Sequence, residues 1–539
     1  MMFRSKINAL RVRTTRDFTA AVSVLAGAMA LAISIVGCDP ALVIVPGDGD
    51  FLSTGRTLSH FQAFQVDPPA EDSAGPQFVV AEDLDDDGLT DLVSAWNQSQ
   101  PVQIHLQRRS ESGEIRFETT TLAGNIPVVR VAGLAVTDFD RDGRADVAVL
   151  VKESGLEDAP SCLDGDEATG RFYAGLVIVY FGPSDSAETN QALAWDEVRV
   201  APSFLAGQRG PVAGPPEEEG YTAMSAGDMD NDGDMDLVVA INSACSGANA
   251  ETLIFTNPNA AAIRNGSWSL FIVPDEFPKS KGPLLDDQDF EPDSKIKDVQ
   301  LGDVDGDGDL DIVASFPNAG SLNIRWYRNP ILDVQDDYHI TNGSWQVGTV
   351  GQVEPRSGFE DLGGADIVRL GDIDRDGILD VVVRSTGGRV VQWLQGPSGP
   401  TTAPLRHIPW RVYTIAEFIE RIPEAIALGD VSGDGQLDLI AAAEGGIVWF
   451  ESQGAPSVTD QWIENIIIDD LAPGRPNNSP ATTDPNVSPN EVAGGTFINT
   501  LLVVDLDGDG REDVVGTLDR SGLSGLSNDA LAWLRNTRR

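Results

Sequence analysis

Seven short acidic segments of the sequence share one nine-residue pattern. Carboxylates stand at positions one, three, five and nine, and glycine stands at position six, as in the segment from Asp303 to Asp311. Carboxylates at this spacing repel one another unless a cation lies among them. Oxygen ligands at alternate positions suit Ca²⁺, which takes about 6–8 oxygens at roughly 2.3–2.6 Å. The pattern therefore predicts up to seven Ca²⁺ sites, with a structural role because metal binding would couple to folding.

The predicted ligands are the residues at positions one, three, five and nine of each copy. In chain order they are Asp83, Asp85, Asp87 and Asp91, then Asp138, Asp140, Asp142 and Asp146, then Asp228, Asp230, Asp232 and Asp236, then Asp303, Asp305, Asp307 and Asp311, then Asp372, Asp374, Asp376 and Asp380, then Asp430, Ser432, Asp434 and Asp438, and finally Asp505, Asp507, Asp509 and Asp513. The sixth copy has Ser432 in place of a carboxylate. Because fewer anionic ligands lower the affinity for Ca²⁺, we expect this site to be the weakest.

Two other interpretations compete with this one. A single acidic run is often only a solvated loop, but here one fixed frame recurs seven times. The EF-hand loop also opens with D-x-D-x-D-G, but it needs a Glu at position twelve and a helix on each side. In this chain the last carboxylate stands at position nine and the flanks are short β-branched runs. The glycine at position six provides a turn that a Cβ would hinder, so we expect loops that join strands.

Each acidic segment lies between apolar runs with the two-residue period of a strand. Apolar residues stand four and two positions ahead of the first Asp, as Val299 and Leu301 do, and a second run follows position nine. A third run follows a turn, and a fourth carries an aromatic residue with an aliphatic one five positions later. These last pairs are Phe117 and Leu122, Trp195 and Val200, Trp268 and Val273, Trp345 and Val350, Trp410 and Ile415, and Trp462 and Ile467.

Only six such pairs follow the seven acidic segments, and a seventh pair, Phe61 and Val66, precedes all of them. An N-terminal strand would then supply the missing outer strand of the last repeat, which is how a ring of four-stranded blades closes on itself. The sequence therefore predicts an all-β fold: a seven-bladed β-propeller of four-stranded blades over residues 58–539, with its last blade closed by an N-terminal strand.

The acidic loops and their flanking strands resemble the FG-GAP/VCBS repeats of bacterial surface proteins, which are related to the propeller of integrin α subunits. The resemblance covers residues from about 58 to 539. It implies a propeller that acts as a protein-interaction or adhesion module, with Ca²⁺ as a structural ion.

Residues 1–37 have the pattern of a secretory signal peptide, with five basic residues ahead of a long apolar run from Phe18 to Val36. The run ends in Ile35-Val36-Gly37-Cys38, which resembles a bacterial lipobox and implies lipidation of Cys38. The alternative is an uncleaved N-terminal anchor. Residues 38–57 would form a tether. Both interpretations place the rest of the chain outside the cytoplasm, in a bacterial cell envelope as a periplasmic or surface protein, with membrane contact through the anchor only.

The other two cysteines, Cys162 and Cys245, fall in equivalent loops of the second and third repeats. In an oxidising compartment they form either a disulfide or two free, buried thiols.

The remaining residues show no sign of catalysis. The four histidines (His60, His105, His339 and His407) have no paired metal-ligand spacing, and neither H-E-x-x-H nor G-x-S-x-G occurs. We therefore predict no catalytic residue, no cofactor-binding residue other than the Ca²⁺ ligands, and no enzyme activity. The formal net charge of −47 argues against nucleic acid as a partner.

The long insertions at 152–175, 201–220, 274–297 and 469–496 all connect strands on the face opposite the acidic loops. They are either functional loops or tolerated decoration. We expect this face to bind a protein or glycan ligand of the cell envelope. The alternative is a lectin-like propeller or a polysaccharide-cleaving enzyme, which predicts exposed aromatic residues that recur between blades. The tryptophans instead stand at strand positions, which favours packing.

Overall fold

The computed structural model describes residues 60–66, 75–98, 101–125, 128–154, 176–204, 220–242, 250–258, 262–274, 295–317, 323–333, 345–351, 353, 364–396, 410–418, 422–443, 446–453, 462–468, 497–519 and 530–538. The predicted signal peptide, the tether, Cys38, Cys162 and Cys245 lie outside these residues. Within them, no helix is long and apolar enough to span a membrane.

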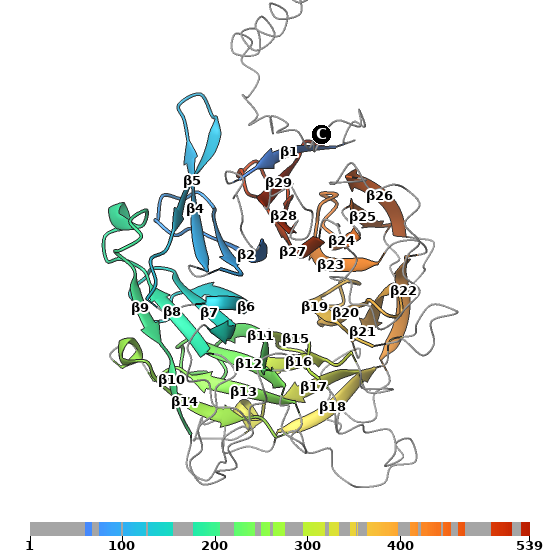
Figure 1. Ribbon diagram of the computed structural model, residues 1–539. Helices are drawn as coiled ribbons and strands as arrows, with labels where there is room; N and C mark the ends of the chain where they lie inside the picture. The colour runs from blue at the N-terminus through green and yellow to red at the C-terminus, as the bar shows by residue number, and fades with distance from the viewer. Residues whose placement is uncertain are drawn as a thin grey trace, which may run out of the picture.

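The strands form seven antiparallel sheets arranged in a ring, so the prediction of a seven-bladed β-propeller is confirmed (Figure 1). The first three blades are β2 (Pro76–Glu82), β3 (Asp91–Trp96), β4 (Val102–Arg109) and β5 (Ile115–Thr121); β6 (Val128–Thr137), β7 (Asp146–Ser154), β8 (Leu176–Phe181) and β9 (Asp196–Arg199); and β11 (Gly220–Gly227), β12 (Asp236–Asn242), β13 (Glu251–Thr256) and β14 (Ser267–Ile272). Among the described residues there are also three single-turn 3₁₀ helices, at Ser186–Glu188, Ile263–Asn265 and Ile331–Asp333.

The other four blades repeat this order. They are β15 (Asp298–Gly302), β16 (Asp311–Ser315), β17 (Ile324–Arg328) and β18 (Gln346–Gly351); β19 (Ile367–Gly371), β20 (Asp380–Ser385), β21 (Val390–Gln395) and β22 (Arg411–Glu417); β23 (Pro423–Gly429), β24 (Asp438–Ala443), β25 (Gly446–Ser452) and β26 (Trp462–Ile468); and β27 (Phe497–Val504), β28 (Asp513–Asp519), β29 (Ala530–Asn536) and β1 (Phe61–Gln65). In each blade, the aromatic residue and the aliphatic residue that predicted the fourth strand lie in or directly beside the outer strand.

The hydrophobic cores lie between neighbouring blades. In one core Val313 and Trp326 of the fourth blade pack with Val381 and Leu394 of the fifth. Because each blade is covered on both faces, its second strand is buried throughout, as β20 is. This double burial explains why the second strands appear in the sequence as continuous apolar runs. Burying one such side chain contributes about 1.5–3 kcal/mol, so the stacked blades hold the loops on a stiff frame.

The seventh blade closes the ring as predicted. The N-terminal strand β1 pairs antiparallel with the C-terminal β29, with Phe64 opposite Trp533. The two rings stack with centroids 4.6 Å apart. The pairing continues past the strand, where the Val66 N–H donates to the Leu531 carbonyl at 3.0 Å. The first and last described strands of the chain are therefore neighbours.

The third blade differs from the prediction because it has a fifth strand. Residues 201–204, at the start of the predicted insertion 201–220, form β10 (Ala201–Phe204), which pairs parallel to the outer strand β14. An outer strand presents unpaired N–H and C=O groups that readily take a further strand. The sequence Ala-Pro-Ser-Phe has no apolar alternation, and its proline is tolerated in a strand at a sheet edge.

Candidate metal centres

The loops between the first and second strands of the blades share one backbone fold, which the position-one aspartate holds. In the fourth loop the Asp303 carboxylate accepts the N–H groups of Asp307 and Gly308, each at 3.0 Å. The same pair of bonds forms in all seven loops, with lengths from 2.6 to 3.2 Å. The position-six glycines have φ between +80° and +99°, which confirms the predicted turn.

A second left-handed residue, which the sequence analysis missed, stands at position four of every loop. Three of these residues are glycines, and four are not: Asp86, Arg141, Asn231 and Arg375, with φ between +56° and +60°. The varied residue types hid this requirement, although glycine, Asn and Asp together at one repeat position are a recognisable signal.

The position-nine aspartate begins the second strand of its blade and is buried in every loop. In the fourth loop the Asp311 carboxylate accepts the N–H of Val304 at 3.2 Å and that of Asn329, just past the third strand, at 2.8 Å. The bond from the end of the third strand recurs in all seven blades at 2.6 to 3.0 Å. Position nine therefore fastens the loop to its own sheet.

Burial raises the pKa of these position-nine carboxyls, and backbone N–H groups only partly oppose the shift. The pKa rises to about 7 for Asp91, Asp146, Asp380 and Asp513, to about 8 for Asp236 and to about 6 for Asp438. The pKa of Asp311 also lies well above its ordinary value. Without a cation nearby, a buried carboxylate among other carboxylates thus favours its protonated form.

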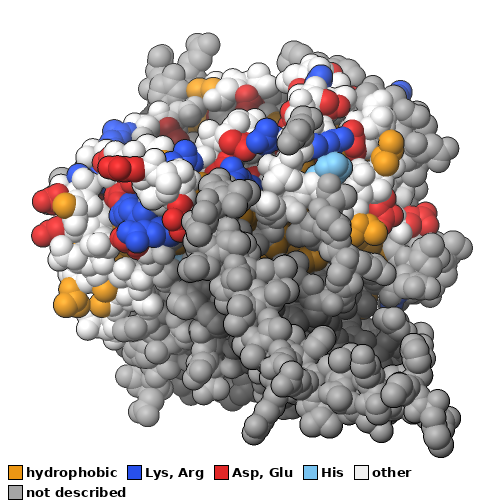
Figure 2. All heavy atoms as spheres, turned by 90° about the horizontal axis from the view of Figure 1, so that it is seen from above, with side chains coloured by type: hydrophobic (Ala, Val, Ile, Leu, Met, Phe, Trp, Pro, Cys, Tyr) orange, Lys and Arg blue, Asp and Glu red, His pale blue; other side chains and the backbone are white. Residues whose placement is uncertain are grey.

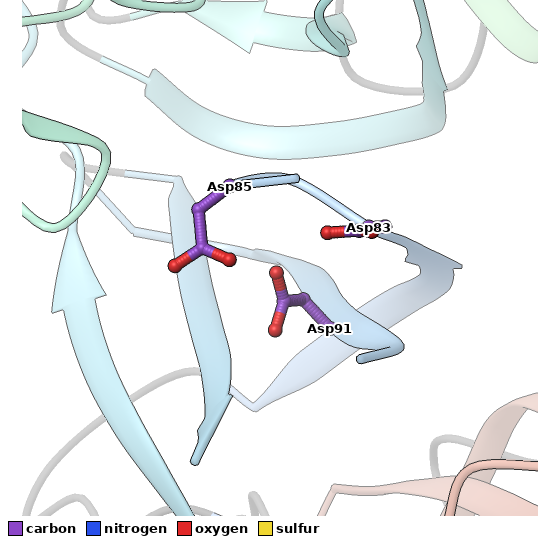
Figure 3. Close-up of side chains that lie close together, drawn as sticks. All are labelled: Asp83, Asp85 and Asp91. Atoms are coloured by element: carbon purple, nitrogen blue, oxygen red, sulfur yellow. The ribbon is translucent and has the colours of Figure 1, made fainter. Parts of the chain in front are cut away.

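Carboxylates at positions one, three and nine converge on one point in the loops. Figure 3 shows Asp83, Asp85 and Asp91 pointing toward one another, with their ligand atoms within 4.8 Å. The clusters of the same composition include Asp138, Asp140 and Asp146; Asp228, Asp230 and Asp236; Asp303, Asp305 and Asp311; and Asp372, Asp374 and Asp380.

In the first and fourth loops, the carboxylate at position three has an oxygen that could bind a cation. Oδ1 of Asp85 and Oδ1 of Asp305 are buried and have no hydrogen-bond partner among the described residues. A buried carboxylate oxygen without a partner is costly, and a hard cation would satisfy it. These clusters can therefore hold metal ions.

The position-five carboxylates are exposed and lie at the outside of the loops. Each accepts the N–H of the residue at position seven, at 2.8 to 3.3 Å. In the sixth loop the Ser432 hydroxyl donates to the Asp430 carboxylate at 3.2 Å, where other loops have a third carboxylate. In the seventh loop Asp507 pairs with Arg535.

Arginines from the blades contact four of the loops, a feature that the sequence analysis missed. Arg108, Arg264, Arg328 and Arg535 each approach the carboxylates at positions three and five of one loop. On the described surface in Figure 2, acidic and basic side chains accordingly lie side by side. The repeated endings Trp-Tyr-Arg-Asn (326–329) and Trp-Leu-Arg-Asn (533–536) of two third strands were the available signal.

Side-chain amides link each of several loops to the next blade, and these too were missed. The Asn329 amide donates to the Leu310 carbonyl of its own loop at 3.1 Å and to the Met229 carbonyl of the preceding loop at 2.8 Å. Gln107, Asn257 and Asn536 make equivalent pairs of bonds. Through Gln107, which donates to the Leu506 carbonyl, the first blade is joined to the seventh.

A serine–histidine pair lies in the first blade, but it is sealed from solvent. His105 accepts or donates one hydrogen bond with Ser94 at 2.8 Å and one with Thr119 at 2.9 Å. Both Ser94 and His105 are fully buried, and burial lowers the pKa of His105 to about 3. With no access for a substrate, this pair is part of the core.

The tryptophans pack as predicted. All ten lie in described residues; nine are buried, and Trp345 is partly buried. Trp533 also has a polar role, since its indole N–H donates to Asp513 at 2.9 Å.

The family of FG-GAP-like repeats matches residues 83–149, which contain the first two acidic loops. No curated protein matches the sequence. Similar solved structures include a lectin of Agrocybe aegerita that recognises non-reducing terminal N-acetylglucosamine, with 14% identity, a TM-score of 0.41 and coverage of 74% of this chain and 82% of the lectin. A chain from the complex of BBS1N with ARL6DN has 14% identity, a TM-score of 0.43 and coverage of 90% and 98%.

Proposed function

We propose that this chain, whose repeat match and seven blades fit an FG-GAP repeat propeller, is a calcium-stabilised protein-interaction module on the outer side of a cell membrane. The FG-GAP propeller fold is typically non-catalytic. The observation that carries the calcium part is the buried, unpartnered position-three oxygen beside two further carboxylates, as at Asp305. Carboxylate oxygens with no nitrogen or sulfur ligand suit Ca²⁺ better than a transition metal.

Each bound Ca²⁺ would stabilise the loop that holds it. Positions one, three and nine would supply carboxylate oxygens, while the backbone N–H groups already bonded to positions one and nine keep those side chains in place. Because a cation that binds only the folded chain raises its stability, Ca²⁺ should raise the melting temperature. Isothermal calorimetry on metal-free protein, with thermal unfolding in Ca²⁺ and without it, tests this step. A melting temperature that does not respond to Ca²⁺ would refute it.

Support for an interaction module comes from the rigidity of the ring and from the burial of its aromatic residues. Sugar-binding propellers need exposed aromatic rings for stacking, yet nine of the ten tryptophans here are buried. The structure therefore offers no tryptophan platform for the carbohydrate alternative. We propose a protein of the cell envelope as the partner.

Affinity capture tests the nature of the partner. The full chain in mild detergent would be immobilised and exposed to envelope extract and to glycan fractions, first with Ca²⁺ and then after its removal. A specific protein that is retained only with Ca²⁺ supports the proposal and identifies its partner. Retention of a polysaccharide instead would overturn it in favour of a lectin.

The location is proposed from the N-terminal sequence. We propose that Cys38 is lipidated and that its acyl chains are the only contact with the membrane. In a bacterial host the chain should fractionate with membranes, and Cys38→Ser should prevent acylation, which mass spectrometry of the N-terminal peptide detects. An unmodified Cys38 in the mature chain would disprove the anchor.

A further inference from the structure

Four arginines each contact the carboxylates at positions three and five of one acidic loop. Arg108, Arg328 and Arg535 lie in the third strand of the same blade as their loop, whereas Arg264 lies in the 3₁₀ helix Ile263–Asn265 of the third blade and reaches the second loop. In the fourth loop the Arg328 guanidinium pairs with Oδ2 of Asp305 and, at 2.6 Å, with Oδ2 of Asp307. In the first loop Arg108 lies 2.7 Å from Oδ2 of Asp85 and 3.1 Å from Oδ2 of Asp87. The guanidinium thus bridges positions three and five. We call this contact the arginine clamp.

The clamp uses only one oxygen of the position-three carboxylate. In Asp305, Oδ2 faces Arg328, whereas Oδ1 is buried and has no hydrogen-bond partner among the described residues. Asp305 belongs to the cluster with Asp303 and Asp311. Asp305 itself is 7% exposed. A partner that binds one oxygen of a ligand fixes the direction of the other. Arg328 therefore orients the free oxygen toward the place of the cation.

The residue at the strand place of Arg328 differs from blade to blade. If the strand register is continued by one residue beyond the pairs Ile312–Tyr327 and Val514–Leu534, Arg328 lies opposite Asp311 and Arg535 lies opposite Asp513. In the fifth blade the same place is held by Gln395, whose amide donates to Asp374. In the sixth blade it is Glu451, which pairs with Arg538 at 3.5 Å.

The glutamate stands in the one blade whose position three has lost its carboxylate, at Ser432. Where position three is an aspartate, the facing residue is cationic or neutral, and where it is a serine, the facing residue is acidic. At this place only Arg328 and Arg535 are cationic. The register puts Leu106, Phe181 and Thr256 there in the first three blades, and Arg108 and Arg264 reach their loops from other places.

A fixed positive charge at this place has two opposing effects on the loop. Without Ca²⁺ it relieves the repulsion among the carboxylates, so the loop stays folded. With Ca²⁺ it repels the incoming ion, because the guanidinium lies within a few ångströms of the ligands and like charges at such distances repel one another even in water. Arg328 is largely covered, with 13% of its side chain exposed, so solvent screens this effect only partly.

We propose that Arg108, Arg264, Arg328 and Arg535 are built-in counter-cations that keep four loops folded without Ca²⁺ and weaken their affinity for it, whereas the fifth loop, with Gln395, depends on the ion. This inference rests on the proposed Ca²⁺ sites. It assigns the arginines as positioning residues and divides the seven loops into clamped and unclamped ones.

The test exchanges the two residues between the fourth and fifth loops. The variants are Arg328→Gln, Gln395→Arg and, to keep the charge, Arg328→Lys. Hydrogen–deuterium exchange with mass spectrometry reports each loop separately, since the position-five and position-six N–H groups are bonded to position one. Exchange would be followed in peptides that contain 303–311 and 372–380 while Ca²⁺ alone is added to metal-free protein.

For Arg328→Gln we expect the fourth loop to lose protection without Ca²⁺ and yet to reach half-protection at roughly tenfold less Ca²⁺, which corresponds to about 1.4 kcal/mol. Gln395→Arg should produce the opposite pair of changes in the fifth loop. In Arg328→Lys the Ca²⁺ concentration for half-protection of the fourth loop should remain near the wild-type value. The loops that carry no substitution serve as internal controls.

The opposite signs separate this proposal from a purely structural role. If Arg328→Gln lowers both the protection without Ca²⁺ and the affinity, or leaves the midpoint unchanged, the inference is wrong. Should Arg328→Gln fail to fold, Gln395→Arg alone decides the question. If no loop of the wild-type chain gains protection with Ca²⁺, it is the proposed function that fails, and the inference fails with it.

Discussion

At the scale of single residues, the acidic positions of each loop have different tasks. Positions one and nine accept backbone N–H groups and so hold the loop and the strand that follows it, as Asp228 and Asp236 do in the third loop. Position three contributes less to the turn: in the second, fifth and seventh loops its carboxylate accepts only the position-five N–H, at 3.1 to 3.3 Å, and position one already holds that group. Metal binding and folding should therefore be separable by substitution at different positions of one loop.

Substitutions in the third loop test this separation. Asp230→Asn should weaken Ca²⁺ binding in that loop at least tenfold, because an anionic ligand is lost, but should leave the metal-free protein as stable or slightly more stable, because like charges are removed. Asp236→Asn replaces one of the two accepting oxygens by an NH₂ group, so either the Met229 N–H or the Asn257 N–H loses its acceptor, which should cost about 1–3 kcal/mol without metal. Urea denaturation of the dialysed variants compares the two. Equal losses of stability would contradict the division of tasks.

The position-nine aspartates also predict how stability depends on pH. Their pKa is raised in the folded chain to about 6 to 8, against an ordinary value near 3.9. Between these limits the folded chain binds more protons than the unfolded chain, so stability falls as pH rises. The metal-free protein should therefore melt at a lower temperature at pH 8 than at pH 5.5. Saturating Ca²⁺ should reduce this slope, because the cation favours the ionised form. A metal-free melting temperature that rises over this range would refute the prediction.

At the scale of loops and strands, the amide links turn neighbouring loops into one connected ring segment. Each link satisfies two buried carbonyls, one from each of two consecutive loops, as Asn329 does for Leu310 and Met229. A displacement of one loop therefore alters the hydrogen bond to the carbonyl at position two of the preceding loop. That same position also donates its N–H to position nine, so the link reaches the metal cluster.

The link predicts a specific loss of stability. Asn329→Ala leaves the carbonyls of Leu310 and Met229 without their donor, which should cost about 1–3 kcal/mol. The urea midpoint should fall accordingly, and the effect should persist with saturating Ca²⁺. Asn465→Ala is a matched control, since Asn465 only donates to the Ile463 carbonyl in an exposed part of β26. If both variants unfold at the same midpoint, the link does not stabilise the ring.

Most features that the sequence predicted are local, and most of those it missed are not. The exceptions are the left-handed residue at position four, which is local and was missed, and the pairing of β1 with β29, which is not local and was predicted from the count of repeats. Alternating apolar residues and the glycine at position six act within a few residues, and so strands, loops and the number of blades followed from them. The clamp joins residues such as Asp307 and Arg328, 21 apart, and the amide link joins Gln107 to Leu506, 399 apart. The first contact forms only when the third strand of a blade pairs with the second, and the other forms only when the blades stack. The strand β10 was missed for the same reason, because the open edge of β14 and not its own sequence makes it extended.

At the scale of the whole molecule, the acidic loops stand on a ring whose closure depends on one short strand. Besides its ladder with β29, β1 is held at its start, where the His60 carbonyl accepts the Thr537 N–H at 2.7 Å. The first and seventh blades also meet through Thr500, whose hydroxyl donates to the Gln77 carbonyl at 2.8 Å. Every blade then has a neighbour on each side, which is what buries both faces of each sheet.

The stacked pair of Phe64 and Trp533 lies at the centre of this closure, and Phe64→Ala should open it. Removing a buried aromatic side chain costs about 3–5 kcal/mol, and here the loss falls on the strand that completes the seventh blade. If the blades support one another around the ring, the whole chain should lose stability in a single transition, with a lower melting temperature for every blade. Gln62→Ala, on the exposed side of the same strand, should have almost no effect. Hydrogen exchange measured separately for each blade distinguishes the alternatives. Loss of protection confined to β1 and β29 would mean that the stability of the ring does not depend on its closure. Loss of protection that extends to the first and sixth blades would show that the closure stabilises the neighbouring blades and their loops.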